Sequence, residues 1–246
     1  MNLLALDAGN TRVKWALHDG ASWSRHGFDD TVAVRLRGLP ADMPAADALV
    51  ASNVAGPAVA DQLRRFAAQR GTPLTIIASQ AHQCGVANGY RDPAQLGTDR
   101  WAALVGARAI APSQATLVIL AGTALTLDAL DADGRHLGGL ILPGARLMRS
   151  SLARGTAALP DAPGAAPPFP ATTTEAIASG ILDAQAGAIE RFHRRVSERV
   201  GVSPRVLGAG GAIHELAACL PFRLTIHDNL VFDGLHAIAR ETGIVS

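Results

Sequence analysis

The feature of this sequence that most constrains its fold is a pattern that occurs twice. In each half an apolar strand runs into a short turn that contains glycine and leaves it as a second strand. Strands interleaved with helical patterns are typical of α/β proteins, and a repeated unit indicates a duplicated architecture. We therefore expect two similar α/β halves with a cleft between them. The paired segments are residues 2–7 and 12–18 in the first half, and 117–120 and 125–130 in the second.

The remaining segments continue this alternation and set the expected domain boundary. Residues 80–98 have little periodicity and predict a long loop, while 175–200 predict a long helix with one apolar face. Residues 155–171 are rich in proline and predict an irregular connection. We expect a first domain over residues 1–113 and a second over 114–246.

Composition excludes several classes of partner. The chain has 246 residues, a formal net charge of +1 and 4% aromatic residues, so neither charge nor base stacking favours nucleic acid. We interpret the basic run 191–195 as the solvated face of a helix. No stretch approaches the roughly 18 apolar residues that a membrane span needs, so we expect no membrane partner. The N-terminus lacks a basic leader region. The two cysteines of the chain, Cys84 and Cys219, are far apart in the sequence, which favours free thiols in a reducing compartment. We therefore expect a cytoplasmic protein.

The turns carry more chemistry than turns require. Asp7 stands at the mouth of the first turn, Thr11 lies inside it, and the only lysine of the chain, Lys14, follows it. Two more glycine turns follow apolar strands, at 121–123 and 208–211. Glycine lets a backbone approach a phosphate closely, although one such turn alone is usually just a turn. Neither GxxxxGK[ST] nor an early GxGxxG is present, so the common nucleotide motifs do not apply.

The three turns resemble those of the acetate kinase, sugar kinase, Hsp70 and actin superfamily. Asp7–Thr11 is similar to its first phosphate loop, residues 120–126 to its second, and 206–212 to its adenosine loop. The resemblance implies duplicated ribonuclease H-like domains flanking a nucleotide cleft. It also implies that Asp7 reaches Mg²⁺ through water, which suits an oxygen-preferring cation. The implied ATP-binding residues are Asp7, Ala8, Gly9, Asn10, Thr11, Arg12, Val13, Lys14 and Thr123.

Two further motifs narrow the family. The segment 88–101 contains Asn-Gly-Tyr and Leu-Gly-Thr-Asp-Arg-Trp, and residues 138–144 read Gly-Gly-Leu-Ile-Leu-Pro-Gly. Together they closely resemble the signatures of type III pantothenate kinases, and the related Bvg accessory factor proteins share them. The resemblance implies ATP-dependent phosphorylation of (R)-pantothenate to 4′-phosphopantothenate, the first step of coenzyme A biosynthesis. It covers nearly the whole chain in the same motif order.

The resemblance also implies a role for each matching residue, and each has a simpler alternative. Asp99 matches the proposed general base, but aspartate also caps helices. Arg100 matches a contact to the pantothenate carboxylate, but it could be a solvated helix charge. Thr173 matches a pantothenate contact made from the partner subunit, but it could cap the long helix, as Thr172 or Thr174 could. Tyr90 could be an ordinary core aromatic and Thr123 an ordinary strand residue. The implied substrate-binding residues are Tyr90, Gly97, Thr98, Asp99, Arg100 and Thr173.

One position departs from the family pattern. The second phosphate loop often carries an aspartate that binds a monovalent cation, and Leu120 stands there instead. Activation by K⁺ or NH₄⁺ is therefore in doubt. The family is homodimeric, and the helix predicted at 175–200 is our candidate interface. Two other functions remain open: a non-catalytic nucleotide-binding regulator of the accessory-factor type, and a sugar or acetate kinase, which would not carry the motifs at 88–101.

Overall fold

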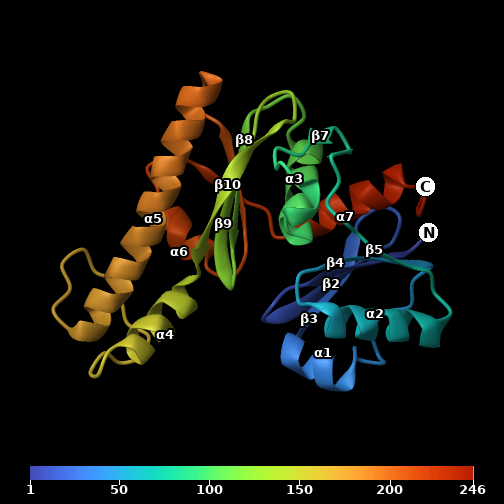
Figure 1. The fold of residues 1–246 in the computed structure, drawn as a ribbon, viewed down its shortest axis with the longest axis horizontal. Coiled ribbons are helices and arrows are strands. Elements are labelled where there is room, and N and C mark those ends of the chain that lie inside the picture. The colour runs from blue at the N-terminus through green and yellow to red at the C-terminus, as the bar shows by residue number, and fades with distance from the viewer. Residues whose placement is uncertain (246) are drawn as a thin grey trace. The chain divides into compact units, whose positions relative to one another are not determined.

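A computed structural model describes residues 1–245 and divides the chain into two compact units (Figure 1). Unit 1 comprises Met1–Ser113, Asp133–His136 and the chain from Asn229 onward, and unit 2 comprises Gln114–Ala132 and Leu137–Asp228. Unit 2 thus begins at Gln114. The C-terminal segment, expected in the second half, packs with unit 1 instead, because its helix buries an apolar face there.

Unit 1 is built on a five-stranded sheet with the order β3-β2-β1-β4-β5. β1 pairs with β2 in antiparallel fashion and with β4 in parallel fashion, so β1 lies at the centre of the sheet. Its side chains from Leu3 to Leu6 are fully or almost fully buried, as expected for a strand covered on both faces. The strands are β1 (Leu3–Ala8), β2 (Arg12–His18), β3 (Trp23–Asp30), β4 (Ala48–Asn53) and β5 (Leu74–Ile76).

Helices cover both faces of this sheet (Figure 1). On one face, Val34, Val59 and Leu63 of the first two helices join β1 and β4 in a buried core. On the other face, α3 and α7 pack closely on each other; a Cβ at Gly106 or at Gly234 would overlap backbone of the facing helix. The helices are α1 (Thr31–Arg37), α2 (Pro57–Arg70), α3 (Thr98–Ile110) and α7 (Leu230–Glu241).

Several short elements of unit 1 do not follow from the sequence pattern. β3 reads Trp-Ser-Arg-His-Gly-Phe-Asp-Asp, a sequence without alternating apolar residues. Such a sequence can form a strand at the edge of a sheet, where most side chains are exposed. α1 is only 7 residues long and rich in β-branched residues. The predicted loop at 80–98 contains a two-stranded sheet and a short 3₁₀ helix, namely β6 (His82–Gln83), β7 (Val86–Ala87) and η1 (Pro93–Gln95).

Unit 2 contains a second five-stranded sheet, ordered β10-β9-β8-β11-β12. Its strands pair in the same order, relative to the chain, as those of unit 1. Ile189 of the long helix and Ile213 and Leu216 of the next one pack on this sheet. The elements are β8 (Thr116–Ala121), β9 (Ala124–Leu130), β10 (His136–Pro143), β11 (Arg205–Ala209), β12 (Leu224–Ile226), α4 (Ala145–Gly155), α5 (Thr173–Val200) and α6 (Ile213–Cys219).

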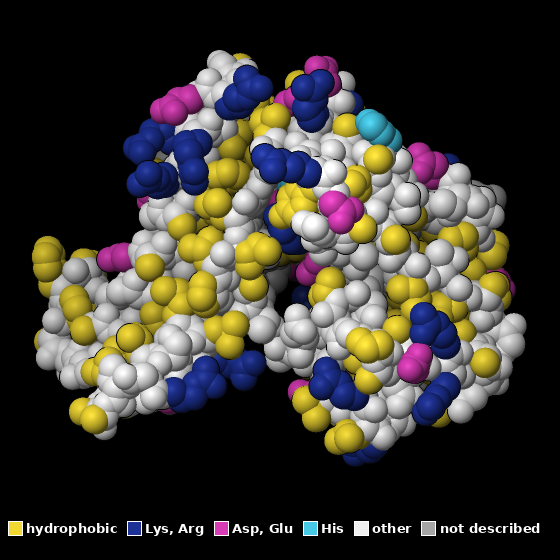
Figure 2. Space-filling model, viewed as in Figure 1, with side chains coloured by type: hydrophobic (Ala, Val, Ile, Leu, Met, Phe, Trp, Pro, Cys, Tyr) yellow, Lys and Arg dark blue, Asp and Glu magenta, His cyan; other side chains and the backbone are white. Residues whose placement is uncertain are grey.

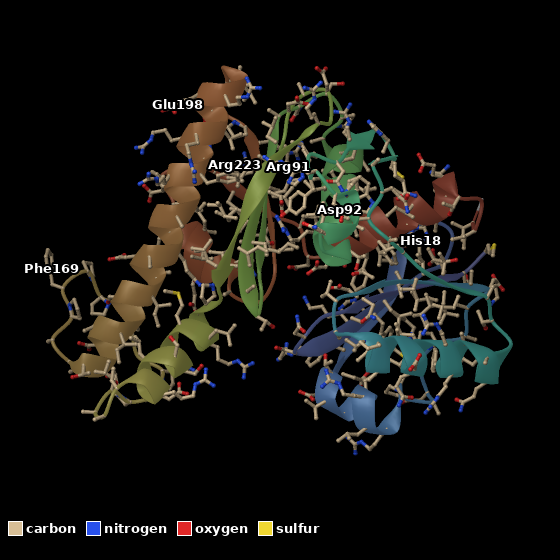
Figure 3. The ribbon with its side chains drawn as sticks, in the orientation of Figure 1. His18, Arg91, Asp92, Phe169, Glu198 and Arg223 are labelled. Carbon is tan, nitrogen blue, oxygen red and sulfur yellow. The ribbon has the colours of Figure 1, made fainter. Side chains whose placement is uncertain are left out.

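The long helix α5 begins with a capping box. The Thr172 hydroxyl accepts a hydrogen bond from the Glu175 amide, and the Glu175 carboxylate accepts one from the Thr172 amide. The preceding proline-rich segment has no regular structure, as predicted, but the Arg149–Asp161 ion pair at 2.8 Å ties it to α4. Phe169 on this segment is 92% exposed, and Figure 3 shows its side chain pointing away from the helices of unit 2.

The basic run is exposed on α5. Figure 2 shows a cluster of Lys and Arg side chains over one end of this helix, and Arg191, Arg194 and Arg195 are all exposed. They share the helix with Glu190 and Glu198, so the surface carries both signs of charge. No helix within residues 1–245 has both the length and the apolar character of a membrane span.

A stacked pair of histidines, one at the end of β2 and one in α7, makes the stability of unit 1 depend on pH. His18, labelled in Figure 3, stacks on His236 with 4.0 Å between ring centroids. Burial, followed by the charges of His18 and Arg240, lowers the pKa of His236 below 6.5, while Asp233 acts in the opposite direction. The unfolded chain therefore binds more protons at His236 than the folded protein does near this pH. The stability that the neutral His236 contributes is fully present above pH 6.5 and is lost as the pH falls below it.

We expect His236 to contribute a decrease in the free energy of unfolding between pH 7 and pH 5, and we expect His236→Phe to remove that contribution. Phenylalanine keeps the stacked ring and removes the titrating group. Urea denaturation across this pH range measures the effect, with His214→Phe on exposed α6 as the control. Equal slopes in the wild type and in His236→Phe would show that His236 does not contribute.

Candidate active site

Asp7 lies at the end of the central strand of unit 1, where the sheet opens toward the first glycine turn. In the strand register it stands beside Lys14 of β2 on one side and Ser52 of β4 on the other. β1 and β4 run parallel, so both strands end at the same edge of the sheet, which is where ligands bind in open α/β folds. The sequence therefore folds a carboxylate, an ammonium group and a hydroxyl into one neighbourhood.

The carboxylate of Asp7 has an unusual environment. Burial and, after it, the nearby charge of Asp99 raise the pKa of Asp7 from 3.8 to about 6, while Lys14 and a hydrogen bond from Ser52 act against the rise. Its Oδ1 atom is buried and has no hydrogen-bond partner. A buried carboxylate oxygen without a donor is costly, so this atom is suited to a positively charged or protic ligand.

The start of α3 is tied to the same edge of the sheet. The Thr98 hydroxyl accepts a hydrogen bond from the Asn53 amide at 3.1 Å and lies 3.2 Å from the Ser52 hydroxyl. These contacts bring the first turn of α3, including Asp99, to the end of β4, and they explain why Asp99 influences Asp7. Thr98, predicted to bind substrate, therefore has a structural task as well.

The first glycine turn is supported from behind. The Gly9 amide donates to the Arg12 carbonyl at 3.0 Å, which closes the turn, and the Thr31 hydroxyl donates to the Gly9 carbonyl at 2.7 Å. The Thr31 amide also donates to the Thr11 carbonyl at 3.0 Å. The helix α1, which begins at Thr31, thus holds the turn rigid. A preformed turn of this kind can present backbone amides to a phosphate group.

The eight residues predicted to bind ATP around this turn do not all offer side chains. Ala8 and Val13 are fully buried in the core, so any contact from them to a ligand would be made by backbone atoms. Asn10, Arg12 and Lys14 are exposed. The Arg12 guanidinium lies 4.2 Å from the centroid of the Phe28 ring, which holds that cation against β3.

Arg100 is not a solvated helix charge, because it is only 4% exposed. Its Nη1 donates to the Tyr90 hydroxyl at 2.9 Å, and its guanidinium lies 5.7 Å from the centre of the tyrosine ring. Tyr90 is half-buried and lies on the loop, so it is not an ordinary core aromatic. The structure thus brings together two of the residues predicted to bind substrate.

Asp99 is not the cap of α3. The helix begins at Thr98, its N-cap is Gly97, and no side chain caps it. Asp99 lies in the first turn, where its Oδ1 accepts a hydrogen bond from the Arg100 amide at 2.8 Å. The positive end of the helix dipole stabilises a carboxylate there. A Cβ at Gly97 would lie 2.7 Å from Asp99 Oδ1, so glycine leaves room for this carboxylate.

Unit 2 contributes a separate group of close backbone contacts around Thr123. The Gly144 amide donates to the Thr123 carbonyl at 3.0 Å, and a Cβ at Gly144 would overlap this turn. Gly210, at φ +109°, lies so close to Ala121 that a Cβ there would overlap the Ala121 backbone. The predicted second phosphate loop and adenosine loop therefore lie side by side. Glycine at 144, next to α4, was not assigned a role from sequence, although its proline-glycine motif is a signal for it.

Two other predicted residues of unit 2 lie at exposed or semi-exposed positions. Thr173 is the first residue of α5 and is exposed, and Thr172 takes the capping role that the sequence left open among three threonines. Leu120 is half-buried at the end of β8, opposite Thr126, whose buried hydroxyl has no hydrogen-bond partner. An aliphatic side chain at position 120 cannot ligate a cation.

The residues around Asp7 fit a hydrated Mg²⁺ better than a fully protein-bound metal. Residues 1–245 contain no group of three or more His, Cys, Asp or Glu side chains arranged to hold a metal ion. Mg²⁺ keeps several waters and is commonly held by one or two carboxylates together with substrate phosphates. The partnerless Oδ1 of Asp7 is the atom best placed for that role.

Three residues near the predicted site residues were not assigned a role from sequence. Ser52 positions Thr98, and its signal was only the end of an apolar strand. Asn88 donates from its amide to the carbonyls of Gln80 and Pro93 and accepts from the Tyr90 amide, which shapes the loop. His136 lies against Tyr90 with 5.7 Å between ring centroids. Nothing in the local sequence around His136 indicates this long-range contact.

Comparisons with known proteins agree with these observations. A family model described as type III pantothenate kinase matches residues 3–195. A type III pantothenate kinase of Dechloromonas aromatica (strain RCB) is 42% identical over 238 residues, covering 96% of this chain and 98% of that protein. One from Aromatoleum aromaticum is 44% identical over 240 residues, covering 97% and 98%.

Solved structures share the fold at low sequence identity. A Campylobacter jejuni protein described as a Baf family transcriptional activator has a TM-score of 0.65 at 19% identity, covering 98% of this chain and all of that one. A Sinorhizobium meliloti protein described as a 2-dehydro-3-deoxygalactonokinase has a TM-score of 0.56 at 17% identity, covering 99% and 100%. These likenesses concern the fold alone. The extent and identity of the sequence matches show that this chain belongs to the type III pantothenate kinase family.

Proposed function

We propose that this protein transfers the γ-phosphoryl group of ATP to the 4′-hydroxyl of (R)-pantothenate, releasing ADP and 4′-phosphopantothenate. The observation that carries this proposal is the cluster of Asp7, Asp99 and Lys14, with Arg100 following Asp99 on α3, in unit 1 of a chain that belongs to this kinase family. The two carboxylates are close enough to influence each other, and the two cations are suited to phosphate and carboxylate groups.

Asp99 is the proposed general base. It accepts the proton of the pantothenate hydroxyl as that oxygen attacks the γ-phosphorus, and the bond from phosphorus to the β,γ-bridging oxygen breaks. Phosphoryl transfer needs positioning and charge stabilisation more than strong bases, so an ordinary carboxylate is adequate. The hydrogen bond from the Arg100 amide holds Asp99 Oδ1 in the first turn of α3, which fixes the position of this carboxylate.

Arg100 is the proposed anchor for the pantothenate carboxylate. Its guanidinium is buried and already oriented by the Tyr90 hydroxyl, so little side-chain entropy is lost when substrate binds. Gly97 and Thr98 form the backbone beneath the substrate. Thr173 is proposed to complete the pocket from the partner subunit of a homodimer, and its exposure at the start of α5 supports that role.

The phosphate groups of ATP are proposed to bind at the turn of residues 7–14 and at Thr123. Lys14 and the exposed turn residues supply positive charge and hydrogen-bond donors. Mg²⁺, bound through water to Asp7, would neutralise phosphate charge. Any monovalent cation must be held without a carboxylate at Leu120, so we treat activation by K⁺ or NH₄⁺ as a question for the assay.

The arrangement of the chain supports several further parts of this proposal. We infer that the two units are duplicated ribonuclease H-like domains that flank the nucleotide, since their sheets share one strand order. We also infer a cytoplasmic homodimer that uses α5 as its interface. The reading as a non-catalytic regulator is not favoured, because the relatives are named as kinases and the carboxylates expected of an enzyme are present.

The test is an ADP-release assay with MgATP and (R)-pantothenate, run with K⁺, with NH₄⁺ and with neither. We expect ADP formation that depends on pantothenate and yields a phosphorylated product of the expected mass. Equal rates with K⁺, with NH₄⁺ and with neither would show that the enzyme with leucine at position 120 does not need a monovalent cation. A folded protein that binds ATP but forms no product in any salt would refute the kinase proposal.

A further inference from the structure

The tip of the β9–β10 hairpin supports the loop that carries Tyr90. The strands of this hairpin belong to the sheet of unit 2, yet residues Asp133–His136 group with unit 1. The Ala87 amide donates to the Gly134 carbonyl at 3.0 Å, and Ala87 pairs with Arg135 in an isolated parallel bridge. The backbone of the loop is therefore fixed against the backbone of the hairpin tip.

Two glycines allow this close approach. A Cβ at Gly89 would overlap the carbonyl oxygen of His136, and a Cβ at Gly134 would overlap the carbonyl oxygen of Gly85. Gly134 also has φ +86°, a conformation that side-chain-bearing residues rarely adopt. The contact between loop and hairpin thus depends on the absence of side chains on both sides. The loop and the hairpin tip therefore form a specific contact within unit 1.

The imidazole of His136 continues this contact toward the substrate residues. His136 is only 2% exposed, and its ring stacks on Tyr90 with 5.7 Å between centroids and 19° between planes. Tyr90 in turn accepts a hydrogen bond from Arg100 at 2.9 Å. A continuous series of contacts therefore runs from the hairpin through one aromatic pair to the guanidinium that we expect to bind the substrate carboxylate. Figure 3 shows where this loop lies, by the labelled Arg91 and Asp92 that follow Tyr90.

We propose that His136 is a positioning residue for the acceptor substrate: its ring holds Tyr90 in place, and the Tyr90 hydroxyl keeps Arg100 oriented toward the carboxylate of the substrate. This inference rests on the proposed kinase function, because it concerns the same substrate site. His136 does not touch the reacting atoms. It acts by reducing the freedom that Tyr90 and Arg100 would otherwise lose on binding.

This role predicts a specific kinetic signature. In His136→Ala we expect KM for pantothenate to rise by about 3- to 10-fold, the range that loss of one aromatic pair produces. We expect kcat and the KM for MgATP to stay within about twofold, because the stack of His136 acts on Tyr90, a residue of the proposed acceptor site, and not on the reacting atoms. We expect His136→Phe, which keeps a ring against Tyr90, to restore most of the pantothenate affinity.

Two matched controls separate positioning from general destabilisation. His193 in unit 2 stacks on Phe222 with 3.9 Å between centroids, so His193→Ala removes a similar aromatic pair away from the loop. Gly89→Ala is expected to raise the pantothenate KM as well, by pushing the loop away from the hairpin. Gly155→Ala at the end of α4 adds a methyl group where no atom lies within 4 Å, and we expect no change in KM.

The outcomes distinguish this inference from the function on which it rests. An active wild type with an unchanged pantothenate KM in His136→Ala would overturn the inference and leave the kinase intact. A lower melting temperature in His136→Ala with unchanged KM would assign His136 a purely structural role and would also overturn it. A folded wild type without pantothenate-dependent turnover would refute the kinase, and the inference with it. A raised KM that His136→Phe corrects, with normal KM in His193→Ala, would support it.

Discussion

Replacing Asp99 with asparagine is expected to lower kcat for pantothenate phosphorylation by about 10²- to 10⁴-fold, the usual contribution of a positioned general base. Asparagine has nearly the same shape as aspartate, and its side-chain oxygen can still accept the hydrogen bond from the Arg100 amide. The first turn of α3 should therefore remain intact. Steady-state assays that vary pantothenate and MgATP separately measure the loss and show whether it falls on kcat.

The control for this substitution is Asp61→Asn on α2, an exposed aspartate of the same unit that pairs only with the exposed Arg64 at 2.8 Å. Exposed pairs contribute about 0–1 kcal/mol to stability, so we expect this variant to behave as wild type. If Asp99→Asn loses less than about tenfold in kcat, Asp99 is not the base, because even weak general-base catalysis exceeds that factor.

Replacing Asp7 with asparagine is expected to abolish measurable kinase activity while making the ligand-free protein more stable. Burial, together with the Asp99 charge, raises the pKa of Asp7 from 3.8 to about 6, so the ionised carboxylate is disfavoured in the folded state. At pH 7.5 the folded protein carries this cost and the unfolded chain does not. A rise of that size corresponds to a gain on the order of 2–3 kcal/mol in the variant.

The sign of this effect can be checked by varying pH. A group with a raised folded pKa costs no stability below its unfolded pKa, and the cost is complete only above its folded pKa. The stability difference between Asp7→Asn and wild type should therefore be small near pH 4, grow through pH 6 and stay constant above it. Urea denaturation at several pH values measures it. A variant that is less stable than wild type at pH 7.5 would contradict the expected burial cost.

Without ligand we expect Asp7→Asn to be more stable than wild type, and MgATP should make wild type the more stable protein. The ligand stabilises the state that binds it, so wild type should gain melting temperature on addition of MgATP, and Asp7→Asn should gain much less. The Asp61→Asn variant should gain as much as wild type. Equal gains in Asp7→Asn and wild type would show that Asp7 does not contribute to binding of the metal–nucleotide complex.

Local sequence accounts for most of the elements and for the choice of candidate site residues. The apolar strand before Asp7, the glycine turn after it and the strand that holds Lys14 were all predicted, because alternation of apolar residues and turn chemistry are encoded within a few positions. The motifs at 88–101 indicated both the family and the residues Tyr90 and Arg100, which the structure brings within one hydrogen bond. Family membership required no tertiary information.

Elements whose stability comes from distant contacts could not be predicted in the same way. β3 is an edge strand with a polar sequence, and it exists because β2 offers it a partner. The helix α7, expected in the second half, belongs to unit 1 because Gly106 and Gly234 allow α3 and α7 to pack with almost touching backbones. Such packing depends on pairs of residues far apart in the chain, which no local pattern reveals.

The sequence by itself determined which side chains are available for phosphoryl transfer, because aspartate, lysine and arginine at motif positions are chemical facts of the chain. Only the tertiary structure decided the pKa values, the burial and the orientation of these side chains. Burial and the charge of Asp99 on α3 raise the pKa of Asp7. Arg100 is buried, and its hydrogen bond to the Tyr90 hydroxyl orients the guanidinium. The stack of His136 on Tyr90 is likewise a tertiary contact. The physical reason is that pKa values and side-chain order follow from desolvation and from neighbours brought together by folding.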